Sequence, residues 1–124
     1  MVLGAPKHQC INRYLAALGS GDAAGGVAAL ADAAGGSVDM VLFTKLCIRK
    51  VRLALLVRGG VAGVLDECAD EDTEIISSLA KQERISIAVL RQLVDASHSI
   101  VHSYVKTLPL ECLLLGEGAV DIEG

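Results

Sequence analysis

Apolar residues recur every three or four positions along the first third of the chain, a spacing that predicts amphipathic helices. The first helix is expected over residues 8–20, where the pattern stops at Gly19. Asp22 has a residue type that caps helix N-termini, so a second helix is expected over 23–34. Residues 38–50 are apolar enough for either a third helix or a long strand.

The pattern further along the chain has two interpretations. The turn signal Arg58-Gly59-Gly60 lies between two apolar runs, Val51–Val57 and Val61–Leu65. It predicts either a hairpin or a single helix broken at the glycine pair. Residues 73–108 contain neither glycine nor proline, and their apolar residues keep close to helical spacing. Residues 84–88 alternate instead, as a strand would.

Two architectures therefore remain open. One is an all-α helical bundle with a long helix near 73–108. The other is an α+β fold, in which the N-terminal helices pack on a curved antiparallel sheet. Several strands within 64–108 would need turns without glycine or proline, so the residues by themselves favour the helix there.

The composition suits one domain over residues 1–124 with a core of aliphatic side chains. The chain has 124 residues, 52% of them hydrophobic, and its aromatic residues are Tyr14, Phe43 and Tyr104. No uncharged apolar stretch reaches the roughly 18 residues of a membrane span. The first ten residues also lack the apolar run of a secretory signal. We therefore predict a cytoplasmic protein that does not enter the membrane.

The residues that most often bind metals form no recognised motif. No two of the four cysteines form a CxxC pair; they stand at positions 10, 47, 68 and 112. Their wide spacing favours free thiols. On a helix, Asp95, His98 and His102 would share one face and offer three ligands, but this spacing alone is a weak signal. We predict no metal and no cofactor.

Charge is concentrated in two neighbouring blocks. Five of the eleven basic residues lie between Lys45 and Arg58, and six acidic residues follow within 66–74. Such blocks are usually solvated surface, and opposite charges this close in sequence could also pair across a turn. On a helix, Lys45, Arg49 and Arg52 would share a face that suits a nucleic-acid backbone. The net charge of −4 and the scarcity of aromatic residues argue against a nucleic-acid partner.

Residues 10–34, CINRYLAALGSGDAAGGVAALADAA, resemble the opening of the ketosteroid isomerase family. The matching pieces are Arg13-Tyr14, Ala16-Ala17-Leu18, Gly21-Asp22, Val27-Ala28 and Ala31-Asp32. Members of that family are small cone-shaped α+β proteins of the superfamily related to nuclear transport factor. The resemblance therefore implies the α+β architecture, isomerase activity and a homodimer.

The resemblance also implies a reaction, the double-bond isomerisation of an apolar keto substrate such as a steroid. Tyr14 would donate a hydrogen bond to the oxyanion, Asp39 would carry the proton, and Asp95 would stay neutral as a second donor. Each residue also has an ordinary interpretation. Tyr14 would be a core residue, Asp39 a helix cap and Asp95 a surface residue.

Two further hypotheses need no catalysis. In one, a helical bundle dimerises through the apolar face of 76–108 and binds a protein or RNA through the basic segment 45–58. In the other, the cone of the resemblance binds a small apolar ligand without turnover.

Overall fold

The computed structural model describes the backbone of residues 5–123 and the side chains of residues 8–66, 68–70 and 72–115. Between residues 5 and 123 the secondary structure is helical, and no strand occurs there. The predicted α+β fold with a curved antiparallel sheet is therefore wrong, and the all-helical alternative is confirmed. The elements are α1 (Ala5–Ser20), α2 (Ala23–Gly35), α3 (Met40–Arg58), η1 (Leu65–Glu67), α4 (Asp70–Ala80), α5 (Ile87–Ser99), η2 (Ile100–His102) and α6 (Leu108–Glu123), where η marks a 3-10 helix.

The first two helices lie close to where the sequence predicts them, and residues 38–50 belong to a third. Asp22 caps α2, because its Oδ1 accepts a hydrogen bond from the Gly25 backbone N–H at 3.0 Å. Asp39 caps α3 in the same way, accepting from the Val41 N–H at 2.8 Å. A side-chain cap of this kind contributes about 1 kcal/mol to helix stability.

The predicted hairpin around the glycine pair is wrong. The alternative of one helix broken there holds only up to Arg58, because residues 61–64 form a turn and not a second helical half. Helix α3 continues to Arg58, and the Gly59 N–H donates to the Leu55 carbonyl at 3.0 Å. Gly60 has a φ of +83°, a left-handed conformation that glycine adopts readily and that ends the helix.

The long helix predicted near 73–108 is divided into α4 and α5. Arg58 of α3 provides the physical reason, because its guanidinium donates to the carbonyls of Ala80 at 3.0 Å and Gln82 at 2.6 Å. The Ala80 carbonyl lies in the last turn of α4, where it has no partner within the helix, so Arg58 satisfies it and the helix ends without glycine or proline. Ser86 then caps α5. The strand that the alternating apolar residues at 84–88 predict does not form. Ile85 is instead a buried residue of the connection between α4 and α5.

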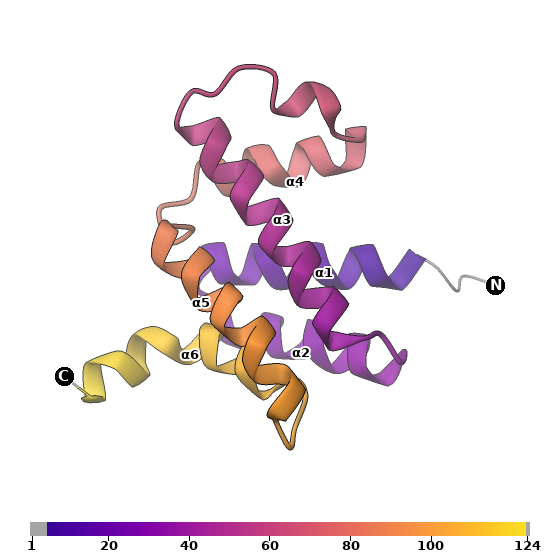
Figure 1. Cartoon of the computed structure of the whole chain (residues 1–124), viewed down its shortest axis with the longest axis vertical. Helices are drawn as coiled ribbons and strands as arrows, with labels where there is room; N and C mark the ends of the chain where they lie inside the picture. Colours follow the sequence, from indigo (N-terminus) through magenta and orange to yellow (C-terminus); the bar gives the residue numbers. More distant parts are fainter. Residues whose placement is uncertain (1–4, 124) are drawn as a thin grey trace.

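Figure 1 shows how the helices cross. Helix α1 packs along α2, and α3 lies across them and packs on α4 and α5. Helix α6 closes the bundle against α2 and α5. The α2–α6 contact is close, since a Cβ added to Gly26 would lie 2.4 Å from a methyl of Leu114. No helix within residues 5–123 is both long and apolar enough to cross a membrane.

The core is aliphatic, as the composition predicts, with one aromatic pair at its centre. The rings of Tyr14 and Phe43 meet edge to face, with centroids 5.8 Å apart and planes at 68°. Leucine, isoleucine, valine and alanine side chains from α1 to α6 surround this pair. Such edge-to-face pairs contribute about 0.5–1.5 kcal/mol beyond the area they bury.

The basic and acidic blocks, expected to be mainly solvated surface, pair at one position in the structure. Lys50 is buried, and its Nζ lies 3.2 Å from Oδ1 of Asp72 in α4. The same Nζ donates to Oδ1 of Asn12 in α1 at 2.7 Å. One lysine therefore ties three helices together, and its charge is matched where it leaves water.

Candidate functional site

Tyr14 occupies the core. Its hydroxyl donates a hydrogen bond to the Leu110 carbonyl at 2.7 Å, and its side chain is completely buried. Burial raises the pKa of Tyr14 well above its ordinary value, so the phenol stays protonated. The ordinary interpretation of this residue, a core tyrosine with a satisfied hydroxyl, is confirmed. It joins α1 to the first turn of α6.

The two predicted catalytic aspartates lie on different elements. Asp39 is exposed and caps α3, so its interpretation as a helix cap is confirmed. Asp95 is exposed on α5, as expected of a surface residue. Of the two, Asp39 lines the cleft described below, whereas Asp95 does not belong to its lining.

The possible metal ligands do not come together. His98 lies on α5 and His102 in the 3-10 helix η2, where the α-helical spacing from Asp95 is lost. Among the side chains of residues 8–66, 68–70 and 72–115, no group of three or more histidine, cysteine or acidic residues forms a metal site. The cysteines are free thiols, two of them buried, and burial raises the pKa of Cys47.

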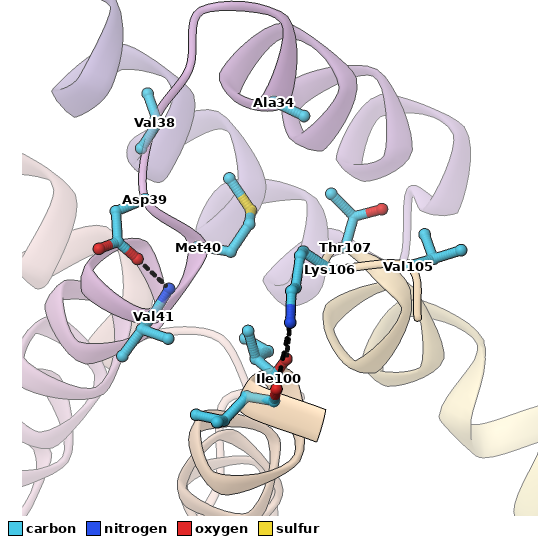
Figure 2. A pocket seen from close by; sticks show the side chains of 10 residues that line it. Ala34, Val38, Asp39, Met40, Val41, Ile100, Val105, Lys106 and Thr107 are labelled. Carbon is cyan, nitrogen blue, oxygen red and sulfur yellow. Dashed lines mark hydrogen bonds between the residues drawn. The ribbon is translucent and has the colours of Figure 1, made fainter. Parts of the chain in front are cut away.

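A cleft of about 610 Å³ opens between the α2–α3 connection and the segment that follows α5. Figure 2 shows its lining, which is mostly aliphatic and includes Val38, Met40, Val41 and Ile100. The connection turns at Ser37, whose φ of +63° is the left-handed conformation that often follows a helix. This turn precedes Val38 and the α3 N-cap, both of which line the cleft.

The two charged groups of the cleft are already bonded. Lys106 reaches across to η2, where its Nζ donates to the carbonyls of Ile100 at 3.0 Å and Val101 at 3.2 Å (Figure 2). The Asp39 carboxylate accepts hydrogen bonds at the start of α3. The cleft therefore presents the methylenes of Lys106 and aliphatic side chains to any occupant.

Exposed apolar side chains border the cleft. Val101 is 59% exposed, and Val105 and Leu108 are about half exposed. Tyr104, one of the three aromatic residues of the chain, is completely exposed in the same segment. Exposed apolar residues gathered around a cleft are typical of surfaces that another molecule covers.

The outward face of α3 carries a row of cations that we name the basic stripe: Lys45, Arg49 and Arg52. All three are exposed, and none forms an ion pair or a hydrogen bond with the described side chains. Leu42, 39% exposed, precedes them on the same face. Because residues four apart are neighbours on a helix, Lys45 lies one turn from Val41, which lines the cleft. The basic stripe therefore begins one helical turn from the lining of the cleft.

Part of this surface was predictable. The spacing of the stripe predicted that its three cations share a face, and the structure confirms it. The cleft joins residues 34–41 to residues 100–107, and no pattern in the sequence signals that contact. No protein-family model, curated protein or solved structure matches this chain.

Proposed function

We propose that this chain is a non-catalytic interaction module that binds an acidic amphipathic helix of a partner protein along α3. The observation that carries the proposal is the basic stripe, three exposed cations without partners among the described side chains. A folded surface that leaves three aligned cations unpaired attracts a ligand with complementary negative charge.

The surroundings of the stripe favour a protein over a nucleic acid. Leu42 is exposed beside the cations, and Leu56 is half-buried on the same face of the helix, whereas Leu46 and Leu53 pack against the core. Leucines contribute to binding when an apolar face covers them, which a phosphate backbone does not provide. An amphipathic helix with acidic and apolar side chains matches both parts of the surface.

Alternative functions have less support. The isomerase and its steroid substrate were implied by a fold that residues 5–123 do not form. A homodimer through the apolar face of 76–108 has less support because Ile76, Leu79 and Leu93 face the core of their own chain. We place the module in the cytoplasm, where a reducing environment keeps thiols free, because its four cysteines are unpaired.

The binding we expect is weak and sensitive to salt. An exposed ion pair contributes about 0.2–1 kcal/mol, so three pairs add at most a few kcal/mol. The attraction falls as ionic strength rises, because the screening length is only about 8 Å at physiological salt. A dissociation constant of 1 mM corresponds to about 4 kcal/mol, so the ion pairs alone support binding no tighter than the millimolar range, and tighter binding requires apolar contacts with the helix.

The test is fluorescence anisotropy with a labelled peptide of about 16 residues built from glutamate, leucine and alanine in an amphipathic helical pattern. We expect Arg49→Glu to weaken binding by roughly tenfold, since a like charge replaces an attraction and 1.4 kcal/mol corresponds to a factor of ten. Lys81→Glu makes the same charge change at the exposed end of α4 and should alter binding less than twofold.

Two results would contradict the proposal. Equal weakening by Arg49→Glu and Lys81→Glu would mean that net charge, and not the stripe, attracts the peptide. Stripe-dependent binding of a 16-base-pair RNA duplex, without binding of the peptide, would assign the surface to nucleic acid instead. Circular dichroism of both variants checks that the helical content is unchanged.

A further inference from the structure

We infer that the cleft between α3 and η2 receives the apolar anchor of the same acidic helix and thereby sets the register of the partner. The inference rests on the proposed function and adds a sequence pattern for the partner. Binding of a helix in a groove through apolar anchors at i and i+3 or i+4 is a common mode of peptide recognition.

The size of the cleft suits two apolar side chains. Its volume of about 610 Å³ falls within the range of about 300–1,000 Å³ that holds a drug-sized molecule, so one side chain would leave it partly empty. Two leucines four residues apart project from the same face of a helix and would enter together. The aliphatic lining from Val38, Val41 and Val101 matches such a pair.

The bonded charges in the cleft argue against a small charged ligand. Lys106 uses its ammonium on two backbone carbonyls, and Asp39 uses its carboxylate on the α3 N-terminus. A charged ligand would have to compete with these bonds, whereas an apolar side chain leaves both intact.

Charge complementarity then fixes the spacing within the partner. Lys45, Arg49 and Arg52 lie 4, 8 and 11 residues beyond Val41, which lines the cleft. A partner helix that lies along α3 rises by the same ~1.5 Å per residue, so its acidic residues should stand about 4, 8 and 11 positions from its anchor. The inferred occupant is an acidic helix with its apolar pair at one end.

The experiment compares three peptides, of which the first two have identical composition. The registered peptide carries a leucine pair at one end and glutamates about 4, 8 and 11 residues further along. In the shifted peptide the three glutamates move by two positions, which turns them by about 200° to the far face. A third peptide keeps the registered glutamates but has glutamine in place of both leucines. Each is made in both chain directions and measured with the full chain by fluorescence anisotropy.

We expect the registered peptide to bind at least tenfold more tightly than the shifted and the glutamine peptides in one chain direction. Val101→Gln should remove most of that advantage, because it replaces an apolar wall of the cleft without changing the net charge. Ile87→Gln is the matched control, since Ile87 is 63% exposed on α5, Val101 is 59% exposed, and Ile87 does not line the cleft.

The results separate this inference from the proposed function. If all three peptides bind equally and Arg49→Glu weakens them all, the stripe acts alone and the inference is overturned while the proposed function stands. If Arg49→Glu weakens none of them, both fail. If a neutral apolar dye such as Nile red binds in a Val101-dependent way and the registered peptide does not displace it, the cleft holds a small molecule and the inference is overturned.

Discussion

Arg58→Met should destabilise the chain by removing the bonds that end α4. In the structure the Arg58 guanidinium donates to three carbonyls at that end: Leu79 at 3.4 Å, Ala80 at 3.0 Å and Gln82 at 2.6 Å. A hydrogen bond from a charged donor contributes about 1.5–3 kcal/mol when it is shielded from water. Arg58 is exposed and two of the bonds are at the surface, so water would replace part of this contribution. We expect a total loss of about 1–2 kcal/mol in the free energy of unfolding.

The assay is urea unfolding followed by circular dichroism at the helical band. With a denaturant slope of about 1.5 kcal/mol per molar, the loss should lower the unfolding midpoint by about 0.7–1.3 M. Arg58→Lys keeps the positive charge at the helix end but loses the planar fork, so it should recover less than half of the loss. An unchanged midpoint in Arg58→Met would refute the role of Arg58 in the break between α4 and α5. A lysine variant as stable as the parent would show that charge alone is sufficient.

Two further predictions concern packing and pH. Gly26→Ala should destabilise the chain by about 1–2 kcal/mol, because its Cβ would collide with a leucine of α6. Gly35→Ala, with no atom within 4 Å of the added Cβ, should leave stability unchanged or raise it, and urea midpoints of the two variants provide the comparison. Burial raises the pKa of both Tyr14 and Cys47, so the unfolded chain loses these protons at lower pH than the folded one. The contribution of these two groups to stability should be constant below about pH 8 and fall as pH rises through 9 and 10, with a shallower fall in Cys47→Ala. A rise in stability over that range, or an equal slope in the variant, would contradict the assignment.

Local patterns predicted the N-terminal third of the fold because the forces there are local. Asp22 and the glycine pair at 59–60 act within a few residues of their own positions, so their residue types are sufficient signals. The break between α4 and α5 depends on Arg58, more than twenty positions earlier in the chain. No glycine or proline marks it, and Ser86, which caps α5, is too weak a signal by itself to interrupt a helical period that continues through it.

The resemblance over residues 10–34 predicted local structure better than fold. Two alanine-rich helices joined at Gly21-Asp22 do form there, as they would in the cone-shaped family. The sheet was implied for later segments, where the resemblance provided few matching residues. Tyr14 fits both the isomerase resemblance and the helical bundle. A tyrosine on the inner face of the first helix is expected in either fold, and here its hydroxyl donates a hydrogen bond inside the core.

The basic block between Lys45 and Arg58 is one cluster in sequence but two groups in the structure, and helical geometry explains the division. At about 100° per residue, Lys45, Arg49 and Arg52 fall within an arc of about 60° on α3. Lys50 and Arg58 point at least ~100° away from the centre of that arc, toward the other helices, where each finds acceptors. Counting charges along the sequence therefore overestimates the cations available to a partner and hides those that hold the bundle together. The three that remain unpaired adjoin a cleft with bonded charges and an apolar border, so attraction and apolar contact are offered side by side on one surface.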